Sequence, residues 1–305
     1  MYKVQARPRR RIACAALSVL ALMGCSPASI LAPEGPVTAA NRTILLNALT
    51  IMLAIVIPTI IATIAFAWWF RAGNPRAKYR PDFVYSGRIE MIVWSIPILV
   101  ILFLGGVIWV GSHDLDPRRP IPSAMPPLEV QVVSLDWKWL FIYPREGIAT
   151  VNMLVLPVGR PVHFRLTSGS VMNTFFIPRL GSMIYTMNRM ETELNLRADR
   201  PAIMYGQSAH FSGDGFSDMN FGVRSVPVGE FNGWVSGTRG KGAVLDSRGY
   251  ADLARQSLDV PARAYGAVQP RLFEAIVTQK LKPAPGPEQG RGGDPHVSHD
   301  PPERK

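Results

Sequence analysis

Residues 43–70 read TILLNALTIMLAIVIPTIIATIAFAWWF, a run of 28 residues without one charged side chain. A helix of that length, at about 1.5 Å per residue, exceeds the roughly 30 Å hydrocarbon core of a bilayer. A second uncharged run of 22 residues, MIVWSIPILVILFLGGVIWVGS, occupies 91–112. One such run could be the buried helix of a soluble core, but two of this length predict a hairpin of transmembrane helices.

The segment between the two runs, 71–90, is rich in basic residues. Its charged side chains are Arg71, Arg76, Lys78, Arg80 and Arg88 against Asp82 and Glu90. Short loops with an excess of Lys and Arg remain in the cytoplasm. We therefore expect 71–90 to be cytoplasmic and the outer flanks of both runs to be periplasmic.

The N-terminus has the pattern of a secretory signal. Basic residues precede an apolar stretch, Ile12 to Met23, that is too short to span a bilayer comfortably. The stretch ends in Leu22-Met23-Gly24-Cys25, which resembles a bacterial lipobox, whose cysteine is diacylated and becomes the new N-terminus. The alternative is an ordinary signal with a chance cysteine. We expect 1–24 to be a lipoprotein signal peptide, Cys25 to carry the lipid, and 25–42 to lie in the periplasm of a bacterial inner-membrane protein.

The net charge of +11 could suggest nucleic acid as a partner. Five of the 33 basic residues lie in the predicted signal, which leaves 28 against 22 acidic residues, and several of these belong to 71–90. No basic stripe interleaved with aromatic residues is present, so we exclude nucleic acid binding. The two cysteines are Cys14 and Cys25, so the mature chain would have neither an internal disulfide nor a cysteine-based metal cluster.

After a proline-rich connector at 113–127, the pattern changes to period two. Val162, Phe164 and Leu166 alternate with polar residues, as in half-buried strands, and glycine turns separate such segments. Residues 128–227 therefore predict a single antiparallel β-sandwich. The segment 228–281 predicts a helical extension, with short helices at 228–238, 247–258 and 270–280. The tail 282–305 is rich in proline and glycine, has almost no bulky apolar residue, and is expected to be disordered.

Four motifs point to one family. They are LDWKWLFIYP (135–144), GIATVN (147–152), SVMNTFFIPRLG (170–181) and FSGDGFSDM (211–219). In this order, with the two apolar runs, the chain resembles subunit II of cytochrome bo-type ubiquinol oxidases, of the haem–copper oxidase superfamily, over roughly residues 20–280.

The resemblance implies a fold and a role. The expected fold is a transmembrane helix hairpin plus an all-β, cupredoxin-like sandwich in the periplasm with short C-terminal helices. The expected role is a non-redox subunit of a proton-pumping enzyme that passes electrons from ubiquinol to oxygen. Its partners would be oxidase subunit I, smaller membrane subunits and the lipid bilayer, and ubiquinol would be met through the complex. No cofactor or catalytic centre is expected on this chain, because haems and copper belong to subunit I.

The wider family includes copper-bearing subunits, in which two cysteine thiolates bridge two copper ions. Two histidines, a methionine and a backbone carbonyl complete that site. The resemblance places these positions on Asn173, Ser208, His210, Ser212, Phe216 and Met219. Serine hydroxyls are poor donors for copper, and the mature chain would have one cysteine, at its lipidated end. We therefore predict no metal site, and a packing role for Met219.

Three further residues are candidates for a role in a complex. Trp137 and Trp139 belong to an aromatic strand and are predicted to pack against subunit I. The resemblance places Glu90 near the entrance of the proton channel of subunit I, and an ionisable group at the membrane edge is a functional candidate. The alternative for Glu90 is a solvated acid at a helix start, where the helix dipole favours it.

Two other functions remain open. One is a cytochrome c oxidase subunit II with a true copper centre, against which the missing thiolates argue. The other is a free-standing membrane lipoprotein that serves as a binding module. Pro58 and Pro97 interrupt the apolar runs and, with Glu90, indicate helices that pack on another protein, which argues against this second alternative.

Overall fold

A computed structural model of the protein describes residues 30–78 and 80–284. The predicted signal peptide 1–24, the lipidation site Cys25 and the tail from residue 285 onward lie outside the described residues.

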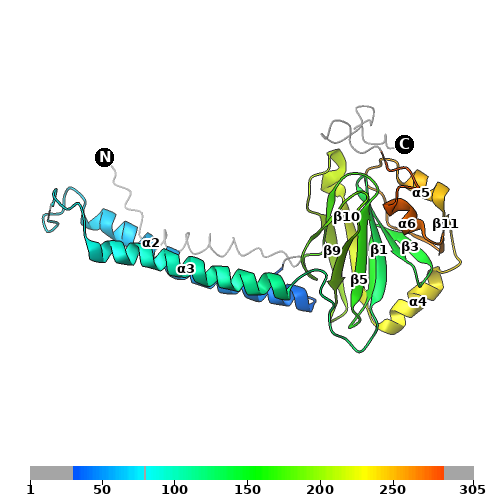
Figure 1. Cartoon of the computed structure of the whole chain (residues 1–305), viewed down its shortest axis with the longest axis horizontal. Helices are drawn as coiled ribbons and strands as arrows, with labels where there is room; N and C mark the ends of the chain where they lie inside the picture. Colours follow the sequence, from blue (N-terminus) through cyan, green and yellow to red (C-terminus); the bar gives the residue numbers. More distant parts are fainter. Residues whose placement is uncertain (1–29, 79, 285–305) are drawn as a thin grey trace, which may run out of the picture.

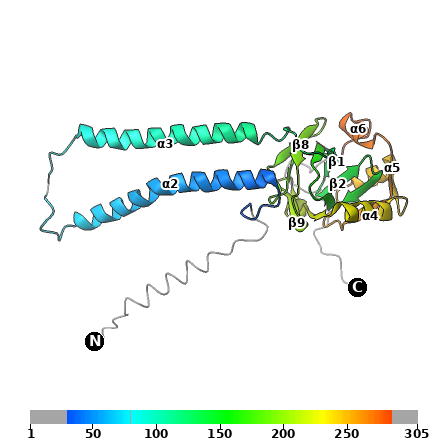
Figure 2. The ribbon, with the colours of Figure 1, turned by 90° about the horizontal axis from the view of Figure 1, so that it is seen from below.

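Two long helices form the predicted hairpin (Figures 1 and 2). Helix α2 spans Pro36–Trp69 and helix α3 spans Gly87–Asp114, and both are long and apolar enough to cross a membrane. Each helix begins several residues before its uncharged run, so the first turns of α2 are expected to lie outside the bilayer. Pro36 occupies the first turn of α2, where the backbone N–H that proline lacks would have no partner within the helix. Pro58 and Pro97 lie within the helices, as expected.

The domain that follows the hairpin is a sandwich of two sheets at one end of the helices (Figure 1). The larger sheet has the order β12-β3-β2-β1-β5-β8 and the smaller one the order β4-β10-β9-β6-β7. The strands of the larger sheet are β12 (Arg263–Tyr265), β3 (Ile148–Val151), β2 (Lys138–Tyr143), β1 (Leu128–Leu135), β5 (Val162–Ser168) and β8 (Thr192–Leu196). Those of the smaller sheet are β4 (Met153–Pro157), β10 (Asn220–Val226), β9 (Ala202–Ser208), β6 (Asn173–Phe176) and β7 (Ile184–Thr186).

The sandwich is not wholly antiparallel, which corrects the sequence-based prediction. Strand β1 pairs in parallel with β5, and β4 pairs in parallel with β10. Period-two alternation indicates which face of a strand is buried but carries no information on the direction of its neighbour. After β1 the chain passes through the antiparallel strands β2 and β3 and then crosses to the smaller sheet as β4. It then returns to the larger sheet as β5, which lies beside β1 and runs in the same direction.

Aromatic rings fill the space between the two sheets. Phe175 and Phe221 stack with centroids 5.3 Å apart, and Trp139 lies 5.5 Å from Phe175 at a steep angle. Gly206 permits this packing, because a Cβ there would lie 2.1 Å from the ring of Phe221. The close packing of these rings therefore requires glycine at position 206 of β9.

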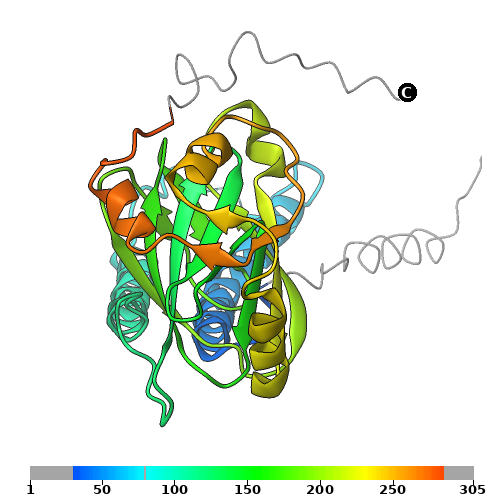
Figure 3. The ribbon, with the colours of Figure 1, turned by 90° about the vertical axis from the view of Figure 1, so that its right-hand side faces the viewer.

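Most of the C-terminal extension lies over the outer face of the larger sheet (Figure 3), while its first helix packs Phe231 and Val235 into the core between the two sheets. It consists of α4 (Val228–Thr238), β11 (Val244–Leu245), α5 (Ser247–Leu253), β12, β13 (Ala267–Val268) and α6 (Leu272–Val277). A second apolar core results, in which Leu140 and Ile142 of β2 pack with Tyr250 and Phe273. This core explains why every residue of β2 is buried. Helix α4 has the predicted bounds, α5 and α6 are shorter than predicted, and the edge strand β12 was not predicted.

The sandwich is attached to the hairpin at two points. Before α2, the buried carboxylate of Glu34 pairs with both Arg179 and Arg200. After α3, the backbone N–H of Asn195 donates to the carbonyl of Pro117 over 2.9 Å. Both ends of the hairpin are thus bound to the domain, which fixes its placement at the end of the helices (Figure 2).

Candidate functional site

The six positions matched to a copper site gather at one end of the smaller sheet. Asn173 begins β6 and Ser208 ends β9, and the antiparallel pairing of these strands brings the two residues together. The other positions follow in the loop between β9 and β10, which includes the short 3₁₀ helix η1 (Asp214–Asp218).

Hydrogen bonds among these side chains occupy their polar atoms. The hydroxyl of Ser208 lies 3.1 Å from Asn173 Oδ1, to which it donates, and 3.3 Å from the carbonyl oxygen of His210. Ser212 Oγ lies 3.9 Å from Met219 Sδ. Asn173 and Met219 are each 1% exposed, so the cluster belongs to the interior of the domain.

The two aromatic side chains of the cluster, His210 and Phe216, pack against other rings. The imidazole of His210 meets Tyr185 edge-on, with ring centroids 5.9 Å apart, and Phe216 meets Phe211 at 5.6 Å. The structure therefore brings together Asn173, Ser208, Ser212, Met219 and the carbonyl of His210, but not the His210 imidazole.

The donor set of this cluster does not fit a thiolate-bridged copper pair. It offers two hydroxyls, an amide and a thioether, where such a pair requires cysteine thiolates. Within residues 30–78 and 80–284, no group of three or more His, Cys, Asp or Glu side chains is placed to hold a metal ion. The geometry supports a packed polar core at this end of the sheet.

Trp137 and Trp139 are both buried within the chain, so the prediction that they pack against a partner is wrong. Trp137 forms the turn between β1 and β2, donates from Nε1 to the carbonyl of Ser212 over 3.1 Å, and is 2% exposed. Its ring is covered by Gly215 and by Leu258 of the extension. Trp139 points between the sheets and is fully buried. Trp137 is buried because the extension packs near it, and Trp139 is buried because alternate side chains of β2 point between the sheets.

Glu90 lies in the first turn of α3, at the end of the hairpin remote from the sandwich (Figure 1). Its Oε2 accepts a hydrogen bond from Nε1 of Trp94, one turn further along, over 3.1 Å. Both side chains are exposed on the surface of this chain. The contact gives the carboxylate a defined direction on the outer face of the helix.

A buried lysine, which sequence reasoning missed, lies between the two tryptophans. Lys138 is 1% exposed, and Nζ donates to the carbonyl of Arg255 over 2.7 Å and to Ser257 Oγ over 2.6 Å. Burial, and to a lesser degree Arg263, lower the pKa of Lys138 from 10.5 to about 8, although Asp136 opposes the shift. A charged residue flanked by tryptophans was the sequence signal that could have revealed it.

Buried polar atoms without a hydrogen-bond partner are also found among the described residues. Both carboxylate oxygens of Asp136, and the hydroxyls of Ser170 and Tyr250, are buried without a hydrogen-bond partner in the part of the chain that the structure describes. Burial raises the pKa of the Tyr250 hydroxyl, and the carboxylate of Asp136 adds to that effect. The interface between sheet and extension is therefore polar around Lys138 and Asp136.

Arg165 of β5 makes a second polar link between sheet and extension. Its guanidinium pairs with Glu191 at 2.6 Å, with Glu129 at 3.2 Å and with Glu274 of α6 at 3.4 Å. It also lies over the ring of Phe273, 5.1 Å from the centroid. Glu191, and to a lesser degree Glu129, raise the pKa of Arg165 although burial opposes the shift, so this link keeps its positive charge.

Comparison with known proteins places this architecture in one class. Residues 132–226 match the family model described as "Cytochrome C oxidase subunit II, periplasmic domain", and residues 239–283 match the "COX Aromatic Rich Motif". The sandwich is therefore that of an oxidase subunit II, and the extension carries a second motif of the same class.

Full-length relatives define the family further. The chain is 46% identical to ubiquinol oxidase subunit 2 of Acetobacter aceti, over 86% of this chain and 85% of that protein. It is 43% identical to cytochrome bo(3) ubiquinol oxidase subunit 2 of Pseudomonas aeruginosa, over 90% and 83%. It is 34% identical to quinol oxidase subunit 2 of Bacillus subtilis, over 77% and 74%. The chain belongs to the ubiquinol oxidase subunit 2 family, which confirms the predicted family and fold class.

Proposed function

We propose that this chain is a non-redox subunit of a ubiquinol oxidase that docks on subunit I and stabilises it. The observation that supports this most directly is the polar cluster of Ser208, Ser212 and Asn173, which holds no thiolate at the positions matched to a copper site. Quinol delivers electrons from within the bilayer, so a periplasmic electron relay is dispensable. The haems and copper of the complex then belong to subunit I, and the chain contributes structure.

The proposal includes the placement of the chain in the membrane. The segment 71–90 faces the cytoplasm, the sandwich faces the periplasm, and Cys25 carries a lipid that adds a third attachment to the bilayer. The excess of basic residues in 71–90 and the periplasmic domain matched by residues 132–226 support this orientation.

We also propose that Glu90 collects protons at the cytoplasmic entrance of the proton channel in subunit I. Three features support this role. The carboxylate lies at the start of α3, is exposed on this chain, and is directed by Trp94. An exposed carboxylate beside a basic loop at the membrane edge can exchange protons with the cytoplasm and present them to a neighbouring subunit.

The first test is oxygen consumption by the complex that co-purifies with the tagged chain. The complex is supplied in turn with ubiquinol and with reduced cytochrome c. We expect turnover with ubiquinol alone. Turnover with cytochrome c would contradict the proposal, because electrons would then enter through a site for which this chain lacks the ligands. If no partner co-purified, the free-standing lipoprotein would become the better account.

A further inference from the structure

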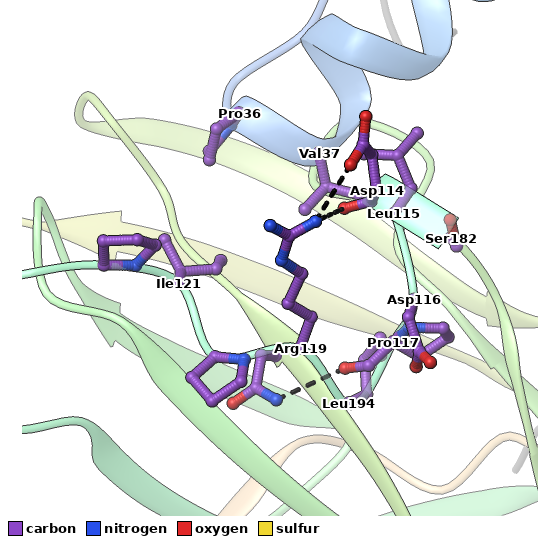
Figure 4. Close-up of a pocket in the computed structure, with 13 residues that line it drawn as sticks. Pro36, Val37, Asp114, Leu115, Asp116, Pro117, Arg119, Ile121, Ser182 and Leu194 are labelled. Atoms are coloured by element: carbon purple, nitrogen blue, oxygen red, sulfur yellow. Dashed lines mark hydrogen bonds and ion pairs between the residues drawn. The ribbon is translucent and has the colours of Figure 1, made fainter. Parts of the chain in front are cut away.

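Two cavities meet at the periplasmic end of the hairpin. The first, of about 260 Å³, lies between the start of α2, the end of α3 and the connector, and its lining includes Val37, Asp114, Asp116 and Arg119 (Figure 4). The second, of about 710 Å³, is an apolar groove between α2 and α3. Both are lined by Asp114 and Leu115, so the first cavity, a chamber with polar and apolar residues in its lining, adjoins the groove there.

The groove results from small residues on α3. At Gly111 the two helices touch, since an added Cβ would lie 2.8 Å from Ile44 of α2. Five residues earlier in α3, and so further into the membrane, Gly106 lines the groove, and nothing lies within 4 Å of the position that its Cβ would take. The walls there are Leu102, Phe103 and Val107. The helices therefore meet at one point and leave an apolar space below it.

The length of the groove matches one leaflet of a membrane. Its lining on α3 runs from Leu102 to Asp114, which is about 18 Å of helix. Half of a roughly 30 Å hydrocarbon core plus the start of the interface has the same depth. A transmembrane helix about 10–12 Å wide would instead need a space that continued along both helices.

The chamber above the groove carries charges of both signs. The Arg119 guanidinium points into it and pairs with Asp114 over 3.0 Å, and the carboxylate of Asp116 lines the same space (Figure 4). About 60% of the side-chain surface of Arg119 is exposed, so the guanidinium can take a second anionic partner. An amphiphile with a phosphate and an ammonium group in its head would complement this set.

We propose that the hairpin holds one zwitterionic phospholipid of the phosphatidylethanolamine class from the periplasmic leaflet. Its phosphate binds Arg119, its ammonium group lies near Asp114 and Asp116, and one acyl chain fills the groove beside Gly106. Trp109 and His113, whose rings lie 4.6 Å apart at the same end of α3, are at the depth of the headgroups. The lipid would fill the space between hairpin and sandwich.

The test is the amount of phosphatidylethanolamine that remains with the tagged full-length chain, and any subunit that accompanies it, after extensive detergent washing. Lipid is counted by native mass spectrometry and by extraction. Gly106→Leu fills the groove, and Gly105→Leu is the matched control, because position 105 also faces open space but does not line the groove. We expect about one lipid per chain in the wild type and in Gly105→Leu, and at least a fivefold loss in Gly106→Leu.

A second variant tests the head of the site. Arg119→Gln should lower retention of phosphatidylethanolamine several-fold, and phosphatidylglycerol added in its place should be retained several-fold less than phosphatidylethanolamine by the wild type. Equal lipid retention in Gly106→Leu and Gly105→Leu would overturn the proposal. So would loss of the partner subunits in Gly106→Leu alone, since the groove would then hold a protein segment. Equal retention of both lipids would overturn the assigned headgroup. Because lipid is counted per chain, these outcomes are separate from failure of the oxidase assay.

Discussion

At the scale of single residues, Lys138 is the least expected side chain of the domain, because an ammonium group is costly to bury. Its three hydrogen bonds to the extension and to the carbonyl of Asp136 limit that cost. In the folded protein its pKa is lowered from 10.5 to about 8. Between about pH 8 and pH 10.5 the unfolded chain therefore binds more protons at this residue than the folded chain does, so stability rises with pH across this window.

Lys138→Met provides the comparison. The melting temperature of the wild type, relative to that of Lys138→Met, should increase as pH rises from 8 to 10. Below pH 8 both states of the wild type are protonated, and the difference should be flat. The measurement is thermal unfolding of the purified complex in a pH series. A pH-independent difference would mean that Lys138 keeps its proton throughout.

The serines matched to the copper positions give a second prediction at this scale. Ser208 lies within hydrogen-bond distance of Asn173 and of the His210 carbonyl, Ser212 bonds to Met219, and a neutral hydrogen bond of this kind contributes about 0.5–1.5 kcal/mol. Ser208→Ala with Ser212→Ala should therefore lower the free energy of unfolding by about 1–3 kcal/mol and leave the rate of ubiquinol oxidation unchanged. Melting temperature and oxygen consumption of the same preparation measure both. Lost turnover in a fully assembled, stable complex would indicate that the cluster has a functional role.

At the scale of elements, α6 is the anchor of the extension. Phe273 is fully buried between the larger sheet and this helix, and Arg165 lies over its ring. Truncation of a buried phenylalanine costs about 3–5 kcal/mol. Phe273→Ala should lower the melting temperature of the domain strongly and expose the extension to limited proteolysis. Ile203→Ala, at a position 81% exposed on the same domain, is the control and should change the stability by less than about 0.5 kcal/mol.

The sequence predicts an element only where its residues form a recognisable pattern. Uncharged length identified α2 and α3, and alternation identified β5, whose Phe164 and Leu166 point inward. Neither signal reports how strands are ordered, so the parallel pairing of β1 with β5 was not foreseen. The burial of Trp137 could not be foreseen either, because Leu258, which covers it, is more than a hundred residues further along the chain.

The candidate site was predictable only in part, for a related reason. The residue types at Ser208 and Ser212 exclude thiolate chemistry whatever the fold, so that inference needs no coordinates. The pairing of Ser208 with Asn173 depends on the register of β6 and β9, which a sequence pattern does not contain. Lys138 was missed because charge alone predicts exposure, and two of the three acceptors that allow its burial come from the distant extension.

At the scale of the whole molecule, the domain is held at the end of the hairpin by Glu34. Its carboxylate is 6% exposed and lies between Arg179 and Arg200. Removal of one partner from a buried ion pair costs about 3–5 kcal/mol, which applies to Arg179, 18% exposed, and much less to Arg200, 65% exposed. Glu34→Ala should therefore reduce the yield of assembled complex and increase protease cleavage near the start of α2. Glu230→Ala, which removes an exposed pair with Arg224, is the control and should have no measurable effect.

The opposite end of the molecule carries the last prediction. If Glu90 supplies protons to subunit I, Glu90→Gln should slow ubiquinol oxidation by roughly threefold to tenfold, since one surface charge raises the local concentration of a cation by a factor of that order. The loss should grow as pH rises, because free protons become scarce and capture by the carboxylate then limits turnover. The measurement is oxygen consumption from pH 6 to pH 9, with proton uptake followed in reconstituted vesicles.

Three companion variants separate this role from a structural one. Glu90→Asp should restore most of the rate, and Trp94→Phe, which removes the hydrogen bond to the carboxylate, should show a smaller loss with the same pH trend. Asp82→Asn removes a charge from the same predicted cytoplasmic segment, 71–90, without touching α3, and should leave the rate unchanged. A uniform loss at every pH would indicate that Glu90 only stabilises the start of α3 through the helix dipole. Equal losses in Glu90→Gln and Asp82→Asn would indicate that any negative charge in this segment has the same effect. Either result would contradict the proton-collecting role of Glu90. A pH-dependent loss confined to position 90 and its tryptophan would place the proton entrance on this subunit.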